Sequence, residues 1–158
     1  MRYHHLLVSC VFLIICILGI SSCAPSPEPI EYGTDNCSYC KMTIIEQSHG
    51  AELVTSKGKV YKFDSIECMA AYILKNKIRK EGIHSLLVTD FEDPGVFVDA
   101  ISATFLHSAQ LRSPMGLNLT AVQNREVGIS LLNKYDGDLL DWMEVLALVN
   151  DEWLKRVK

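Results

Sequence analysis

A strand pair followed directly by a helix is the pattern that most limits how this chain can fold. The stretch AELVTSKGKVYKF, residues 51–63, has two arms rich in β-forming side chains around a Ser-Lys-Gly turn. The next stretch, DSIECMAAYILKNK, places apolar residues on one helical face and predicts a helix from Ser65 to about Lys77. Asp64 is suited to cap this helix, and Glu67 would complete a capping box. The sequence therefore predicts a hairpin packed against the helix that follows it.

A second unit along the chain echoes the first. The arms SLLVTD and GVFVDA, separated by the turn-forming FEDPG, predict two strands within residues 85–100. ISATFLHSA is expected to continue as a bent strand, with a short helix as the alternative, and LTAV is expected to form a short strand. Asn124 is suited to cap a helix through about Lys134, and apolar residues from Leu139 onward recur at helical spacing. Strands and then a helix, twice over, predict an α+β fold with an internal duplication.

The N-terminus has the layout of an export signal. Arg2 precedes an apolar run from Leu6 to Ile20, which is shorter than the roughly 20 apolar residues that a membrane-spanning helix needs. The run ends in ISSC, which resembles the lipobox of bacterial lipoproteins, where cleavage leaves a lipid-modified cysteine as the first residue. We expect residues 1–22 to be a signal peptide and Cys23 to carry lipid, with an uncleaved N-terminal anchor as the alternative. Either arrangement places the rest of the chain outside the cytoplasmic membrane.

The mature chain is expected to be one domain on a short tether. Residues 23–35 include APSPEPIEYG, which has three prolines in ten residues and favours an extended backbone. Residues 36–158 are then enough for one domain with its own core. A formal net charge of −4 gives no basic field for nucleic acid. We expect a lipid-anchored domain on the periplasmic side of a cell membrane, and the sequence does not distinguish the inner membrane from the outer.

The cysteine count points to free thiols. Six cysteines fall to three in the mature domain if Cys10 and Cys16 leave with the signal and Cys23 takes lipid. The remaining set is odd and cannot be closed into intramolecular disulfides: Cys37, Cys40 and Cys68. Leftover thiols outside the cytoplasm need an explanation, and metal binding is one.

Several interpretations of the CSYCKM motif remain open. A redox pair normally lies where a strand opens into a helix, but the MTII that follows Cys40 has the composition of a strand. A disulfide between Cys37 and Cys40 would close a very small loop, gain little entropy and leave Cys68 alone. Zinc prefers four ligands in two spaced pairs, and only one CxxC is present.

Copper(I) accounts for the methionine as well as the cysteines, because thiolates and thioethers are soft ligands that select this ion. In a strand, Cys40 and Met42 would point to the same face. Met115 lies in an SPMG turn, where the flanking Pro and Gly favour display over core packing. Cys68 falls off the apolar stripe of its predicted helix, so a role as ligand and a role in packing are equally compatible with its position.

Four motifs in this order resemble the NosL family of copper-binding lipoproteins, which are accessories of nitrous oxide reductase assembly: CSYCKMTI, YKFDSIECMAAYI, VFVDAISATFL and RSPMG. The resemblance covers nearly everything after the tether. It implies an α+β fold of two related ββα-type halves, with small antiparallel sheets, packed helices and a C-terminal helix.

The resemblance also implies ligands for one Cu(I) ion. Cys40 and Met42 match the family's Cys-x-Met pair, and Met115 matches the methionine of its Met-Gly turn. Cys37 completes a CxxC form that many members have, and Cys68 matches a position that varies in character. The resemblance implies no catalytic activity.

The expected function is therefore that of a lipid-anchored Cu(I) metallochaperone. It would deliver copper to the maturation machinery of a periplasmic copper enzyme, with a transporter or assembly subunit as partner and nitrous oxide reductase as the expected recipient. One rival is an extracytoplasmic thiol–disulfide oxidoreductase that uses Cys37 and Cys40. Another is a structural lipoprotein whose sulfur atoms only pack.

Overall fold

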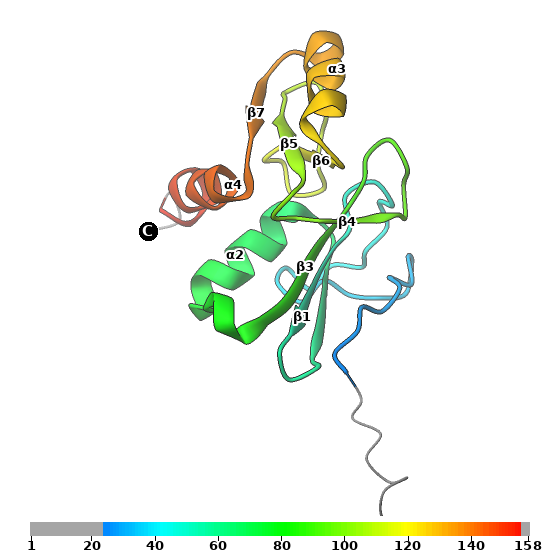
Figure 1. Cartoon of the computed structure of the whole chain (residues 1–158), viewed down its shortest axis with the longest axis vertical. Helices are drawn as coiled ribbons and strands as arrows, with labels where there is room; N and C mark the ends of the chain where they lie inside the picture. The colour runs from blue at the N-terminus through cyan, green and yellow to red at the C-terminus, as the bar shows by residue number, and fades with distance from the viewer. Residues whose placement is uncertain (1–23, 156–158) are drawn as a thin grey trace, which may run out of the picture.

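Two small antiparallel sheets and their helices make up the described part of the chain. The computed structural model describes residues 24–155, so the expected signal peptide and the expected lipidation at Cys23 lie outside the described residues. Within residues 24–155, none of the helices combines the length and the apolar character needed to span a bilayer. Figure 1 shows the first sheet below the second, with the C-terminal helical segment to one side.

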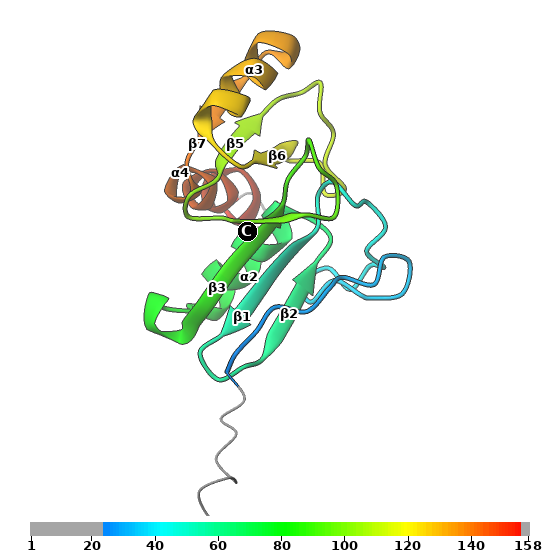
Figure 2. The ribbon, with the colours of Figure 1, turned by 45° about the vertical axis from the view of Figure 1, so that its right-hand side comes forward.

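The first sheet has four strands in the order β2-β1-β3-β4, all antiparallel: β1 (Ala51–Thr55), β2 (Val60–Phe63), β3 (Ile83–Thr89) and β4 (Phe97–Asp99). Gly58, with a φ of 78°, closes the β1–β2 turn where the sequence predicted it. Helix α2 (Ile66–Asn76) follows β2 and packs on one face of this sheet (Figure 2), and a short 3₁₀ turn, η1 (Lys80–Gly82), leads into β3.

The second sheet has three strands in the order β6-β5-β7, also antiparallel: β5 (Thr104–His107), β6 (Leu119–Val122) and β7 (Asp138–Leu140). Helix α3 (Arg125–Tyr135) follows β6, and Asn124 caps it by accepting from the Val127 amide, as predicted. Helix α4 (Trp142–Leu148) continues into a π-helical segment, η2 (Val149–Leu154).

The two halves have the same chain order. In each half the first strand is central, its hairpin partner lies on one side, and the strand that follows the helix lies on the other. The prediction of an α+β fold with two related ββα-type halves is confirmed. The second half begins at β5, however, because β3 pairs with the free edge of β1 and carries β4 with it into the first sheet.

The C-terminal helix begins later than its apolar spacing predicted. Leu139 lies in β7, where it pairs with Leu106 of β5. Asp141 then starts α4 through a capping box, in which the Asp141 side chain accepts from the Glu144 amide and the Glu144 carboxylate accepts from the Asp141 amide. The cap, rather than the apolar pattern, therefore sets where the helix begins.

One core joins the two halves. Leu53 and Phe63 of the first sheet, Met69 of α2, and Phe105 and Trp142 of the second half belong to the same buried cluster. The N-terminal segment also packs on this body, since Ile30 is buried and the Glu28 amide donates to the buried Glu52 carboxylate. The last part of the expected tether therefore lies against the first sheet.

Candidate metal centre

The CxxC motif forms a tight turn instead of the start of a strand. The Lys41 amide donates to the Cys37 carbonyl at 3.1 Å, and the Cys37 amide donates to the Met42 carbonyl at 2.8 Å. Lys41 has a left-handed φ of 69°, which breaks the alternation of side chains that a strand would have. The strand predicted after Cys40 is therefore wrong; only a single bridge, between Asn36 and Thr43, forms there.

This turn is fixed beside the start of α2. The Ser38 amide donates to the Lys62 carbonyl at 2.8 Å, so the turn is bonded to the end of β2, immediately before the helix. On its other side, the Tyr39 ring lies 5.8 Å from the Trp153 ring of η2, and the Lys75 ammonium lies 5.0 Å from the Tyr39 ring centre. The loop is thus held by backbone on one side and by aromatic packing on the other.

The start of α2 differs from the prediction by one residue, with consequences for the site. Ser65 is the N-cap, and its hydroxyl accepts from the Cys68 amide at 3.3 Å. Asp64 precedes the cap, so its carboxylate is free for other contacts. Asp64 Oδ2 accepts from the Cys40 thiol at 3.2 Å, while its buried Oδ1 has no hydrogen-bond partner among the described residues.

Four side chains converge where the turn meets the helix: Cys37, Cys40, Asp64 and Cys68. Their ligand atoms all lie within 4.8 Å of one another. Cys37 is 1% exposed, Asp64 is 3% exposed and Cys68 is fully buried, whereas Cys40 is half-buried and forms the open edge of the cluster. Three free thiols and one carboxylate are therefore preassembled at the end of the first sheet.

The three thiols have very different pKa values, and only that of Cys37 is lowered. The hydrogen bond from the Cys68 thiol is the main cause that lowers the pKa of Cys37 to about 6, and nearby backbone amides add to it. Donating that hydrogen bond raises the pKa of Cys68. Burial raises the pKa of Cys40 to about 12, and its hydrogen bonds to Asp64 and Cys37 act in the same direction. The metal-free cluster therefore favours the thiolate at Cys37 over a thiolate at either neighbour.

Sequence reasoning found three of these four residues and missed Asp64. The prediction assigned its carboxylate to the helix cap, a role that Ser65 takes. The spacing D-x-x-x-C was the available signal, because residues four apart lie on the same side of a helical turn. Cys68, whose role the helical pattern left open, lies inside the cluster.

The two predicted methionine ligands lie outside this four-residue cluster. Met42 follows the turn and is 57% exposed. Met115 is half-buried in the loop between β5 and β6, where it packs against the main core. That loop is fastened to α2 by a hydrogen bond from the Ser113 hydroxyl to the buried Glu67 carboxylate. Their roles as ligands stay a prediction.

The donor set suits a soft metal ion. Three thiols are the ligands that Cu(I) selects, and a carboxylate is a much harder ligand. The same four groups also have the number and donor types of a zinc site, which the single CxxC did not predict. The geometry therefore gives a cluster of four side chains that could hold one metal ion, and these donors are compatible with copper and with zinc.

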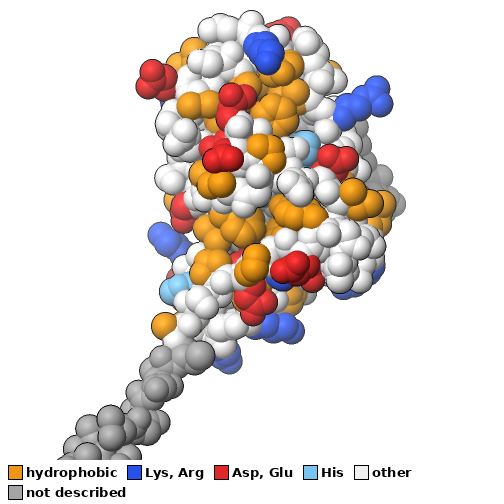
Figure 3. Space-filling view, turned by 90° about the vertical axis from the view of Figure 1, so that its right-hand side faces the viewer, with side chains coloured by type: hydrophobic (Ala, Val, Ile, Leu, Met, Phe, Trp, Pro, Cys, Tyr) orange, Lys and Arg blue, Asp and Glu red, His pale blue; other side chains and the backbone are white. Residues whose placement is uncertain are grey.

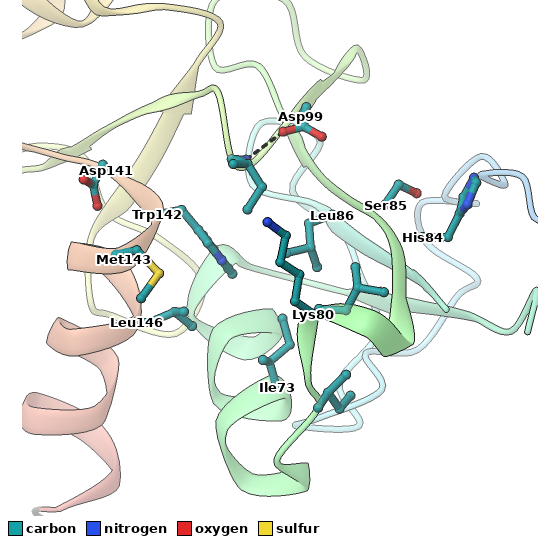
Figure 4. A pocket seen from close by; sticks show the side chains of 13 residues that line it. Ile73, Lys80, His84, Ser85, Leu86, Asp99, Asp141, Trp142, Met143 and Leu146 are labelled. Carbon is teal, nitrogen blue, oxygen red and sulfur yellow. Dashed lines mark hydrogen bonds between the residues drawn. The ribbon is translucent and has the colours of Figure 1, made fainter. Parts of the chain in front are cut away.

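A well-formed pocket lies elsewhere in the structure. A pocket of about 520 Å³ opens between α2, β3 and α4, and its lining includes Leu86, Trp142 and Met143 (Figure 4). Figure 4 shows Asp141 near Trp142 and Met143 of α4, and Asp99 away from them. No cysteine lines it, so this pocket is separate from the thiol cluster.

Comparisons with known proteins decide the family. No curated protein is significantly similar to this chain. The NosL family model matches residues 30–149, most of the described chain. This chain belongs to the NosL family. The family prediction made from the four motifs is thereby confirmed.

A solved NosL protein has the same fold. The crystal structure of the copper chaperone NosL from Shewanella denitrificans superposes with a TM-score of 0.65 at 22% sequence identity. The match covers 76% of this chain and 95% of that one. The small sheets and packed helices described above are therefore a NosL fold.

Proposed function

We propose that this NosL protein is an extracytoplasmic Cu(I) metallochaperone that holds one ion at the cluster of Cys37, Cys40 and Cys68. The observation that carries the proposal is the convergence of three free thiols within 4.8 Å of one another. Family membership and the fold shared with a copper chaperone favour copper over zinc for these ligands. The protein is proposed to carry its ion without performing catalysis.

The protonation state of the cluster suits Cu(I) uptake. Cys37 is already a thiolate at neutral pH, so it offers the first ligand without losing a proton. Bound Cu(I) would then displace the proton of Cys68 or Cys40, because metal ligation requires the thiolate. Asp64 accepts the Cys40 thiol proton in a hydrogen bond and is a poor ligand for a soft ion, so we assign it to orienting Cys40 rather than to the metal.

Release would occur through the open edge of the cluster. Cys37 and Cys68 are buried, whereas Cys40 is half-exposed. A partner ligand can therefore approach beside Cys40 and replace it before the buried thiolates let go. Met42, exposed directly after the turn, is placed to supply a thioether during this exchange.

The surface near the turn fits a protein partner. Met42 is 57% exposed and Ile45 is 70% exposed, so the segment that follows the turn presents two apolar side chains to solvent. The face in Figure 3 shows patches of hydrophobic side chains among acidic ones, with most basic side chains toward its edges. We propose a transporter or assembly subunit of a copper-enzyme maturation system as the partner, with nitrous oxide reductase as the recipient and a lipid anchor at Cys23 on the periplasmic side of the membrane.

Anaerobic titration with Cu(I) against a chromophoric Cu(I) chelator tests the proposal. The wild type should bind one equivalent, and Cys40→Ser or Cys68→Ser should lower the affinity at least tenfold, because each removes a soft ligand. Ser130→Ala, an exposed change on α3, is the matched control and should bind as the wild type does. A parallel titration with Zn(II), followed by addition of Cu(I) to displace the bound zinc, tests which of the two ions the site prefers. Unchanged Cu(I) affinity in both cysteine variants would contradict the site.

One observation also favours a second function. A CxxC pair in which the pKa of one thiol, Cys37, is lowered to about 6 is typical of a dithiol oxidoreductase, although here the half-exposed member of the pair is Cys40. Catalytic reduction of insulin by the wild type, lost in Cys37→Ser, would support this alternative. Stoichiometric Cu(I) binding without such turnover would exclude it.

A further inference from the structure

Glu67 is an acidic residue in a buried position, where a carboxyl group costs folding free energy. It lies in the first turn of α2, next to Cys68, and it is completely buried. The sequence predicted it as the second member of a capping box, but Ser65 is the cap, so the third helical position is Cys68 and the box does not form. Burial raises the pKa of Glu67, and its Oε2 has no hydrogen-bond partner among the described residues. A buried carboxyl group of this kind is retained at a cost in folding free energy.

The other oxygen of this carboxyl group is bonded to the other half of the protein. The Ser113 hydroxyl, also buried, donates to Glu67 Oε1. The same hydroxyl accepts from the Asn118 amide at 2.8 Å, and the Ser113 carbonyl accepts from the Gly116 amide at 3.1 Å. Ser113 therefore closes the loop of residues 113–118 on itself and fastens it to α2.

This connection joins the helix turn that carries Cys68 to the loop that carries Met115, the methionine predicted from the sequence as a further Cu(I) ligand. Glu67 and Cys68 are consecutive residues of one helical turn, which is a rigid unit. Ser113 and Met115 are two residues apart in a loop closed by two hydrogen bonds. Holding Ser113 against Glu67 therefore holds Met115 at a fixed place relative to the helix turn that carries Cys68.

We propose that Glu67 and Ser113 are positioning residues, which set the Met115 thioether relative to the thiol cluster and thereby tune the hold on copper. This inference rests on the proposed Cu(I) function. Neither residue would contact the ion; both act through Met115. Removing partners that orient metal ligands typically lowers metal affinity by about 10–100-fold.

A double-mutant cycle tests this on the mature protein. We expect Ser113→Ala to lower Cu(I) affinity about tenfold, measured by competition with a chromophoric chelator. In a Met115→Leu background the same change should alter affinity less than about twofold, because the residue through which it acts is gone. Ser113→Thr keeps the hydroxyl and should retain most of the wild-type affinity. Glu67→Gln keeps an acceptor oxygen for Ser113 and should do the same.

The outcomes separate this inference from the function on which it rests. If the wild type binds no Cu(I), both are refuted. If it binds tightly but Ser113→Ala has no effect, or lowers affinity equally in the wild type and in the Met115→Leu background, the pair serves only the fold and the inference alone is refuted. Unchanged affinity in Met115→Leu also refutes it. X-ray absorption at the copper edge provides an independent readout, since Ser113→Ala should remove one sulfur neighbour from the bound ion.

Discussion

Replacing Cys68 with alanine removes the hydrogen bond that contributes most to the low pKa of Cys37. That pKa is lowered from 9.0 to about 6, which corresponds to about 4 kcal/mol in favour of the thiolate. At pH 7 a group with a pKa of 6 is about nine-tenths ionised, and one with a pKa of 9 is about one-hundredth ionised. We therefore expect Cys68→Ala to move the Cys37 midpoint from about 6 toward 9 and to remove most of the thiolate at neutral pH.

The assay is the absorbance of thiolate at about 240 nm during an anaerobic pH titration of the metal-free protein. Cys37→Ser gives the baseline, and Cys68→Ser, whose hydroxyl can still donate to Cys37, should keep a low midpoint. Because the Cys37 pKa is lower in the folded state than in the unfolded state, this group stabilises the fold above pH 9, and that contribution is lost as pH falls through about 6. A midpoint that Cys68→Ala leaves unchanged, or a wild type without a thiolate below about pH 8, would refute the reasoning.

Two further predictions concern the frame around the site. Burial raises the pKa of Glu52 from 4.5 to about 7, so its contribution to stability is present below pH 4.5 and is lost as pH rises through 7. Relative to Glu52→Gln, which shares the opposite contribution of Cys37, the wild type should lose up to about 3 kcal/mol of unfolding free energy over that range; urea unfolding of both proteins at about pH 5 and pH 8 measures this, and equal pH dependence would contradict it. Trp153→Ala removes the ring that packs on Tyr39 of the CxxC turn. It should cost at least about 1 kcal/mol in urea unfolding and speed Cu(I) release, with Trp153→Phe as the conservative control; an unchanged release rate would show that the turn needs no such support.

Local patterns in the sequence predicted the elements of the fold well. The hairpin, both main helices and the Asn124 cap follow from side-chain periodicity and capping chemistry, which act within a few residues. The boundary between the halves did not follow, because periodicity identifies a strand but not the sheet edge with which it pairs. β3 looked like the start of the second half and instead completes the first sheet beside β1.

The site was predictable in its chemistry but not in its geometry. The CxxC spacing and the odd number of thiols pointed to metal, and the structure brings Cys37, Cys40 and Cys68 together. The left-handed backbone at Lys41 could not be read from the sequence, since lysine rarely adopts it, and a strand was expected instead. Asp64 was missed because an acidic residue just before a helix has an ordinary explanation as a cap.

The repeated chain order gives the protein a second helix start that corresponds to the one beside the thiol cluster. Counted from the two caps, Ser65 and Asn124, the places of Asp64 and Cys68 are taken in the second half by Gln123 and Val127. The two halves therefore have equivalent helix starts, of which one bears donor atoms and the other does not. We expect one bound ion per polypeptide from this asymmetry, and the second helix start is a position at which another metal site could be engineered.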